Sequence, residues 1–142
     1  MLYLGENADT VARETRLIVR DVFGNDVAQP QRPKIIMTIE YELQRVADLI
    51  DPAVLGRLGV TPSSLLTEWK DIVRAGRTPT TQSIGGAARA VGLEGLIVPS
   101  KRHPGRVNIA VMRENLLVGS FVAIYEPVGF GPSVVTRIDG VR

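Results

Sequence analysis

Apolar and polar residues recur along this chain in patterns that predict both strands and helices. The short apolar stretch 2–4 predicts a first strand. Beyond it, Asn7 or Asp9 can cap a helix whose apolar positions recur with helical spacing to about Phe23. Gly24 follows and is expected to end that helix.

The next region changes from a turn pattern to an alternating one. Prolines and polar residues over 24–33 predict a loop. Over 34–43, apolar and polar residues alternate, which predicts a strand with one face toward the core. That face is expected to carry Ile35, Met37, Ile39, Tyr41 and Leu43.

Three helices are predicted in the middle of the chain. An Asp-Pro and a Thr-Pro pair each combine a capping side chain with a proline at the first helical position. The helices are expected from Pro52 to about Gly59, from Pro62 to about Ala75, and from Thr80 or Thr81 to Gly92.

The last third of the chain predicts strands. The unbroken apolar run 96–98 is typical of a strand buried on both faces. Further strands are expected at 107–112, 121–126 and 134–138. Because helices and strands do not alternate regularly, we expect an α+β fold with a mixed sheet, in one domain over residues 1–142.

Composition excludes several classes of site. The 142 residues include no cysteine, so disulfides, cysteine-ligated metals and cysteine nucleophiles are excluded. A net charge of +2 with scattered basic residues and 5% aromatic residues does not favour nucleic-acid binding, although the pI is about 9.3. No stretch predicts a membrane span or a secretory signal, so we expect a cytoplasmic protein.

Common catalytic and nucleotide-binding motifs are missing. Neither the dinucleotide fingerprint nor the P-loop occurs, and residues 129–131 supply only two of the fingerprint's glycines. The single histidine, His103, lies in a basic, proline- and glycine-containing stretch that predicts a solvated turn rather than a triad. No histidine and carboxylate spacing supports a metal site.

Three residues are candidates for chemistry. On the predicted first helix, Glu14 falls inside the apolar half centred on Val11 and Ile18, and buried carboxylates cluster at functional sites. The alternative is a boundary glutamate paired with Arg13 or with a neighbouring loop. Ser100 follows a buried strand, where a residue lines a cleft or simply returns the chain to solvent.

Tyr3 is the third candidate, although a tyrosine near a terminus is most often a packing residue. The three candidates lie within or beside several segments that occur in the same order in a known family. These are LYL at 2–4 with TVARE at 10–14, DLIDP at 48–52, TQ at 81–82, GLEGLIVPS at 92–100, NIAV at 108–111 and ENL at 114–116. They resemble the RES-domain family over nearly the whole chain.

The resemblance implies a fold similar to that of ADP-ribosyltransferases, with a cleft for NAD. It implies a toxin of a bacterial toxin–antitoxin pair that degrades NAD by phosphorolysis or hydrolysis, or transfers ADP-ribose. NAD is then a substrate and no cofactor is needed. The implied partner is a cognate antitoxin that occludes the cleft, and a homo-oligomer is an additional expectation.

The family's arginine lies upstream of the segment that LYL resembles, and no residue here matches it. The chain therefore resembles an N-terminally incomplete RES domain, which is expected to be less stable and less active than a longer version. The resemblance implies Glu14 as the catalytic carboxylate, with Tyr3 and Ser100 binding NAD. The alternative is an inactive module that acts only by binding another protein.

Overall fold

The computed structural model describes residues 1–30, 34–67, 69–126 and 134–142. In chain order its elements are β1 (Leu2–Gly5), α1 (Ala8–Glu14), β2 (Ile18–Arg20), β3 (Asp26–Ala28), β4 (Ile39–Glu42), β5 (Val46–Asp48), α2 (Pro52–Leu58), α3 (Pro62–Leu65), α4 (Trp69–Arg74), α5 (Thr80–Ala90), β6 (Gly95–Pro99), β7 (Val107–Val111), the 3-10 turn η1 (Arg113–Asn115), β8 (Phe121–Tyr125) and β9 (Val134–Asp139). The predicted α+β class with a mixed sheet is confirmed.

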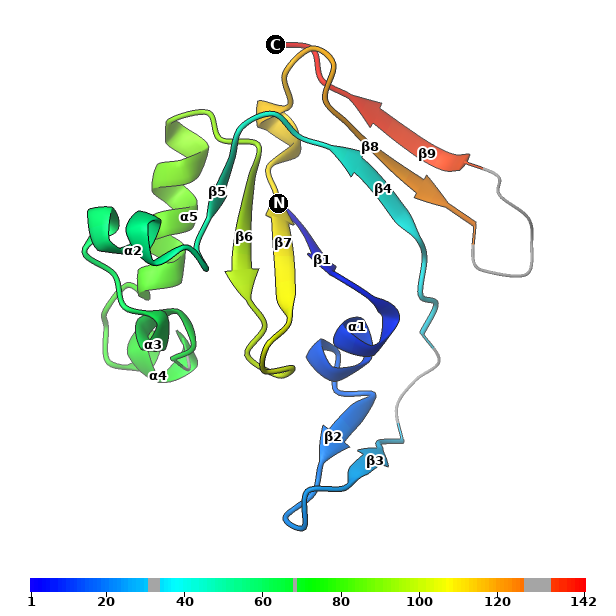
Figure 1. Ribbon diagram of the computed structural model, residues 1–142, viewed down its shortest axis with the longest axis vertical. Helices are drawn as coiled ribbons and strands as arrows, with labels where there is room; N and C mark the ends of the chain where they lie inside the picture. Colours follow the sequence, from blue (N-terminus) through cyan, green and yellow to red (C-terminus); the bar gives the residue numbers. More distant parts are fainter. Residues whose placement is uncertain (31–33, 68, 127–133) are drawn as a thin grey trace.

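The strands form three sheets (Figure 1). The largest has the order β1-β7-β6-β5, in which only the β5–β6 pair is parallel. A second sheet has the order β4-β8-β9, and β2 and β3 form a hairpin that extends away from both. Because β1 pairs with β7, the first strand lies next to a strand about a hundred residues later in the chain, and β6 follows on the other side of β7.

Two apolar clusters hold these elements together. One lies where α2 and α5 pack on the largest sheet, and it contains Leu49, Leu55, Ala88, Leu96, Ala110 and Met112. The other centres on Val111, Leu116 and Val122 and joins the largest sheet to the β4-β8-β9 sheet. Burial of these side chains is the main stabilising contribution to the fold.

The predicted helix signals of the middle region are largely confirmed. Asp51 accepts a hydrogen bond from the Ala53 amide and caps α2, which ends at Gly59 in the left-handed conformation. The helix predicted from Pro62 to about Ala75 is divided, because α3 ends at Leu65 and α4 begins at Trp69. Residue 68, within that predicted helix, lies outside the described residues.

The first helix is much shorter than predicted. Asn7 caps it as expected, but it ends at Glu14. Arg16 adopts a left-handed φ of 59°, and the Leu17 amide then bonds back to the Ala12 carbonyl, which is a Schellman-type ending. Because this ending uses an arginine rather than a glycine, the sequence carries no signal for it.

The chain beyond this ending forms the β2–β3 hairpin, so the helix predicted over 15–23 is wrong. The predicted loop is confirmed at 24–25 and 29–30 but is interrupted by β3. Residues 31–33, the end of that loop, lie outside the described part. Val22, expected beside Ile18 in the apolar stripe, is 93% exposed at the hairpin turn. The apolar stripe from which the burial of Glu14 was predicted therefore extends only over the two turns of α1.

The predicted strand over 34–43 is reduced to β4. Ile39 and Leu43 do pack against the second cluster, as expected. Ile35, however, is 77% exposed and precedes the strand, and Tyr41 faces solvent on its edge. The strands predicted from 96 onward are confirmed within one or two residues, whereas the three-residue β5 was not predicted.

A buried carboxylate fixes the junction of the two larger sheets. Glu94 is fully buried, and its oxygens accept hydrogen bonds from the backbone amides of Gln44, Arg45 and Leu117 at 2.6, 2.7 and 2.8 Å. Burial raises the pKa of Glu94, but these amides together with the Ser120 hydroxyl hold the pKa below its ordinary value.

No helix in the described part of the chain is both long and apolar enough to cross a membrane.

Candidate functional site

The side chain of Glu14 is the centre of a polar cluster beside a cavity. Glu14 is the last residue of α1, and its Oε1 accepts a 2.6 Å hydrogen bond from the Ser100 hydroxyl. The same oxygen accepts a 2.8 Å hydrogen bond from the side-chain amide of Asn108. No described residue donates to the other oxygen, Oε2.

Ser100 and Asn108 reach Glu14 from adjacent strands. Ser100 follows β6 directly, while Asn108 lies in β7, opposite Val98 of β6. Both side chains are buried, with 3% and 1% of their surface exposed. The structure therefore brings Glu14 and Ser100 together, although Ser100 itself lies beneath the carboxylate rather than on the cavity wall.

The Ser100 hydroxyl also organises the loop that follows it. Its oxygen accepts a hydrogen bond from the His103 amide at 3.0 Å, and the Ser100 amide donates to the Arg106 carbonyl. These two bonds close the turn between β6 and β7. The serine is thus held in place by the loop while it donates to Glu14.

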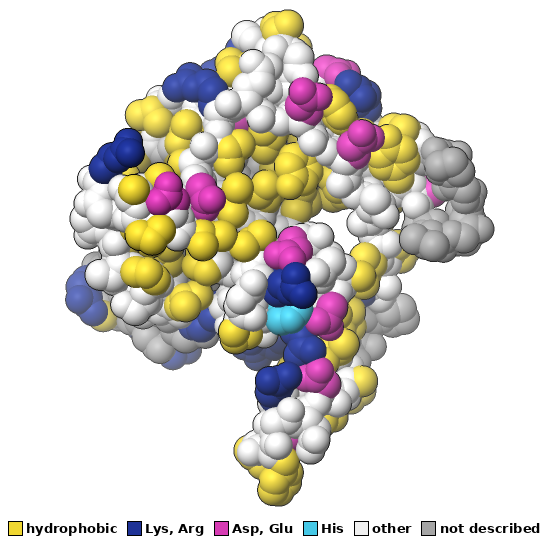
Figure 2. All heavy atoms as spheres, viewed as in Figure 1, with side chains coloured by type: hydrophobic (Ala, Val, Ile, Leu, Met, Phe, Trp, Pro, Cys, Tyr) yellow, Lys and Arg dark blue, Asp and Glu magenta, His cyan; other side chains and the backbone are white. Residues whose placement is uncertain are grey.

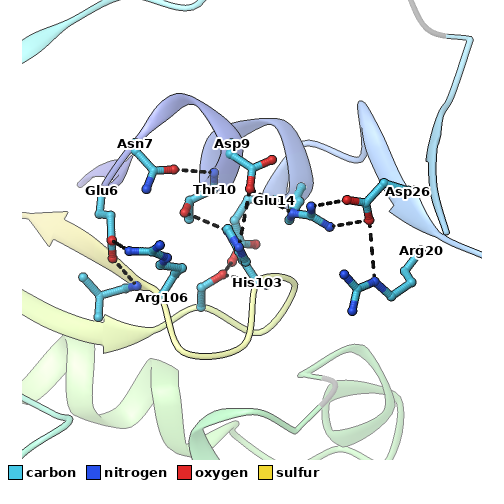
Figure 3. A network of polar contacts seen from close by, with 12 residues as sticks. Glu6, Asn7, Asp9, Thr10, Glu14, Arg20, Asp26, His103 and Arg106 are labelled. Atoms are coloured by element: carbon cyan, nitrogen blue, oxygen red, sulfur yellow. Dashed lines mark hydrogen bonds and ion pairs between the residues drawn. The ribbon is translucent and has the colours of Figure 1, made fainter. Parts of the chain in front are cut away.

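His103 lies in a largely exposed turn, as its sequence context predicted, but its side chain also fastens this loop to α1 (Figure 3). Its Nδ1 lies 3.0 Å from the hydroxyl of the fully buried Thr10, and its Nε2 lies 3.4 Å from an Asp9 oxygen. In Figure 2 the histidine is flanked by acidic and basic side chains. The structure gives it a role in holding α1, which carries Glu14.

A second contact holds the start of α1. Glu6 accepts hydrogen bonds from the Val107 amide and from the Arg106 guanidinium, both at 2.8 Å (Figure 3). The Val107 amide, with a further contribution from Arg106, lowers the pKa of Glu6 below its ordinary value. The end of the β6–β7 loop is therefore anchored to the segment that leads into α1.

Arg13, the residue before Glu14, does not pair with it. Its guanidinium makes two hydrogen bonds to Asp26 of β3, at 2.9 and 2.6 Å, and a third to Asp9. The Arg13 guanidinium lowers the pKa of Asp26 to about 2. Arg13 thus joins α1 to the hairpin, so the alternative in which Glu14 pairs with Arg13 is wrong. A neighbouring loop does provide a partner for Glu14, namely Ser100.

Tyr3, the third candidate, lies in β1 with 56% of its surface exposed. Its hydroxyl oxygen is 3.5 Å from the Asn108 amide nitrogen, so its polar end reaches the same cluster. Burial of that end and the nearby charge of Glu14 raise the pKa of Tyr3, although the Asn108 contact acts in the opposite direction. Tyr3 is therefore protonated at neutral pH.

Glu14 and Tyr3 line a cavity of about 650 Å³. Its apolar wall belongs to the core between α5 and the largest sheet, and hydrophobic side chains gather across the middle of this face in Figure 2. This wall is formed by Leu49, Leu65, Ile84, Leu96, Val98 and Ala110. A cavity of this size and character is typical of small-molecule sites, which have volumes of about 300–1,000 Å³.

Three basic residues also line the cavity, namely Arg89, Lys101 and Arg102. The Arg89 guanidinium is paired with Glu114 at 2.5 Å. Arg102 is half-buried in the loop organised by Ser100, and no carboxylate among the described residues pairs with it. The cavity thus combines one carboxylate with a guanidinium that is open to an anionic ligand.

Sequence reasoning missed Asn108 as a site residue. The available signal was a polar residue inside the apolar run Val107–Val111, at a position that the sheet buries. Such a residue needs hydrogen-bond partners, and its side-chain nitrogen has Glu14 at 2.8 Å and the Tyr3 hydroxyl at 3.5 Å.

Within the described residues, no group of three or more histidine, cysteine and acidic side chains is arranged to hold a metal ion. No curated protein and no solved structure has significant similarity to the chain. The model of one protein family, described as the RES domain, matches residues 1–126. Because this match covers most of the 142 residues, the chain belongs to the RES-domain family, whose members are domains of the toxin–antitoxin type.

Proposed function

We propose that this RES domain binds NAD and cleaves the bond between nicotinamide and ribose. The observation that supports this most strongly is the arrangement of Glu14. Its carboxylate lines the cavity while Ser100 and Asn108 hold only one of its two oxygens. An anion held in this way is suited to stabilise positive charge that develops on a bound substrate.

The chemistry of the bond explains why a carboxylate is useful. Loss of nicotinamide leaves positive charge on the ribose, as in glycoside cleavage. Nicotinamide leaves as a neutral molecule, so no proton has to be delivered to it. The task of Glu14 is then to stabilise the ribosyl cation, either through its charge or by accepting a hydrogen bond from a ribose hydroxyl.

The remaining walls fit the other parts of NAD. The ring of Tyr3 offers a face for nicotinamide, with its protonated hydroxyl next to Asn108. The apolar wall between α5 and β6 suits a stacked aromatic base. Arg102 is our candidate for the diphosphate, because a guanidinium can donate two parallel hydrogen bonds to phosphate oxygens.

Ser100 is assigned a positioning role in this proposal. Its hydroxyl is buried and already donates to Glu14 while accepting from the His103 amide. We therefore assign its effect on NAD to the orientation of Glu14 rather than to a direct contact. This refines the expectation that Ser100 binds NAD itself.

The ribosyl cation can be captured in three ways. Phosphate gives phosphorolysis, water gives hydrolysis, and a protein side chain gives ADP-ribosyl transfer. The decisive experiment is to incubate the purified protein with NAD, with and without inorganic phosphate, and to measure released nicotinamide. Release that requires phosphate identifies phosphorolysis, and equal release without phosphate identifies hydrolysis.

A third arm of this experiment adds a mixture of proteins together with NAD labelled in its ADP-ribose part. Label that becomes attached to protein identifies transfer. NAD binding without any nicotinamide release would instead identify the domain as a binding module, and this outcome would overturn the proposed cleavage.

The partner that we propose is a cognate antitoxin that covers the cavity. Covering Tyr3 and Arg102 would exclude NAD, so a stoichiometric complex should neither bind NAD nor release nicotinamide. Light scattering on the isolated domain tests the additional proposal that it forms a homo-oligomer.

A further inference from the structure

The hydrogen bonds of the buried Asn108 side chain are not explained by a purely structural role. Asn108 is 1% exposed, and its amide nitrogen donates to Glu14 Oε1 at 2.8 Å, with a longer contact of 3.5 Å to the Tyr3 hydroxyl. Its carbonyl oxygen, Oδ1, is fully buried and has no hydrogen-bond partner among the described residues. A buried acceptor without a partner lowers the free energy of unfolding relative to an acceptor that has one.

The orientation of this amide is set by Glu14. If the amide were rotated by half a turn, Oδ1 would lie against Glu14 Oε1, and two acceptors would face each other. The observed orientation keeps the donor on the carboxylate and leaves the acceptor unsatisfied. In this orientation the hydrogen bond to Glu14 is kept, although Oδ1 is left without a hydrogen-bond donor.

A second buried asparagine shows what a structural role looks like in this fold. Asn115 is 4% exposed, and its side-chain nitrogen donates to two backbone carbonyls, those of Arg89 and Leu93, each at 2.9 Å. These bonds tie the end of α5 to the turn after β7. Asn108 makes no comparable contact with the backbone of the described residues.

The contact determines which oxygen of Glu14 is available. Ser100 and Asn108 approach Oε1 from adjacent strands, so both would be lost if the carboxylate turned about its last side-chain bond. Oε2 receives no hydrogen bond from the described residues and belongs to a side chain that lines the cavity. The two donors thus fix the carboxylate with one oxygen directed to a ligand.

We propose that Asn108 is a positioning residue for NAD cleavage, which holds Glu14 Oε1 so that Oε2 faces the ribose of the bound substrate. The inference rests on the proposed function and adds a residue and an assignment of the two carboxylate oxygens. It requires that the effect of Asn108 on the reaction passes through Glu14.

The test compares Asn108→Leu with the matched control Asn115→Leu. Leucine has nearly the same shape as asparagine and removes the donor and the unsatisfied acceptor together. For Asn108→Leu we expect an unchanged or higher Tm, a KM for NAD close to that of wild type, and a kcat of nicotinamide release lowered by about 10- to 100-fold, as for a misplaced catalytic group. For Asn115→Leu we expect the reverse, a lower Tm with kcat retained.

A double variant tests the route of the effect. If Asn108 acts through Glu14, then Asn108→Leu combined with Glu14→Gln should be no slower than Glu14→Gln alone. A kcat for Asn108→Leu equal to that of wild type would overturn the inference, as would a further loss in the double variant.

The wild-type reaction separates this inference from the proposed function. If the wild-type protein releases no nicotinamide, the proposed cleavage has failed, and the contact is judged by melting temperatures of the same single and double variants. If the shift in melting temperature of the double variant equals the sum of the shifts of the two single variants, Asn108 and Glu14 are independent, and the positioning role is overturned as well. If the shift in melting temperature of the double variant differs from that sum, Asn108 and Glu14 are coupled, and the role of Asn108 in holding Glu14 is retained for whatever ligand the cavity binds.

Discussion

The Ser100 hydroxyl donates a 2.6 Å hydrogen bond to Glu14 across 86 residues of sequence. This bond connects the end of the first helix with the end of β6, and it makes the loop after β6 part of the candidate site. The same hydroxyl accepts from the His103 amide, so one oxygen links the carboxylate to the conformation of the loop. Variants at both ends of this bond should therefore separate reactivity from folding.

Replacing Glu14 with glutamine should abolish NAD turnover while NAD binding is largely retained. Glutamine keeps an oxygen that can accept from Ser100 and Asn108, but it has no negative charge when the ribose becomes cationic. Loss of such an electrostatic contribution lowers kcat by about 100- to 1,000-fold, equivalent to about 3–4 kcal/mol. Nicotinamide release and binding of NAD by calorimetry measure the two quantities on the same variant. Retained turnover would remove Glu14 from the mechanism.

Replacing Ser100 with alanine should affect both activity and stability. The variant loses a donor to Glu14 and leaves the His103 amide without its acceptor, which should lower the free energy of unfolding by about 1–3 kcal/mol. We also expect kcat to fall by about 10- to 100-fold because the carboxylate is less well fixed. Ser83→Ala is the control, since its hydroxyl makes only a 3.5 Å contact with the carbonyl of Pro79, the residue before α5. Wild-type kcat in Ser100→Ala would contradict the positioning role.

Replacing Arg102 with glutamine should weaken NAD binding more than it slows the chemical step. Charge-assisted hydrogen bonds are worth about 1.5–3 kcal/mol, so the KM for NAD should rise by about 10- to 100-fold. Nicotinamide mononucleotide, which has no diphosphate, should lose less affinity than NAD. Arg57→Gln, on the exposed last turn of α2, is the control for a general loss of positive charge. Equal losses for both ligands would place Arg102 away from the diphosphate.

Replacing Glu94 with glutamine should destabilise the fold in a pH-dependent way. The variant loses charge-assisted bonds with three backbone amides, so unfolding at neutral pH should require about 1–3 kcal/mol less free energy. The pKa of Glu94 in the folded protein lies below its unfolded value of about 4.3. The stabilisation is therefore fully present above that unfolded value and is lost as the pH falls through the folded pKa.

Denaturant unfolding of wild type and Glu94→Gln, from about pH 7 down to about pH 3, checks this prediction. The difference in unfolding free energy should be constant at the upper end and should narrow below the unfolded pKa. A difference that does not depend on pH would show that the charge of Glu94 is not what stabilises the junction.

The sequence by itself determined much of the architecture, because its signals are local. Capping residues such as Asp51, left-handed glycines such as Gly59 and the apolar run of β6 act within a few residues of the element that they define. The segments that resemble the RES family likewise pointed to Tyr3, Glu14 and Ser100. The segments alone do not predict that Ser100 lies beneath Glu14, or that Ser100 and Asn108 donate to the same oxygen of Glu14.

The tertiary structure decided where the first helix ends and how its last residue is used. Helical periodicity continues past Glu14, but Arg13 binds Asp26 of β3, and Arg16 adopts a left-handed conformation without a glycine. Pairing of β2 with β3 therefore overrides the local helix preference beyond Glu14. The hydrogen bonds that fix Glu14 come from strands far along the chain, and only the sheet register brings their donors to one oxygen.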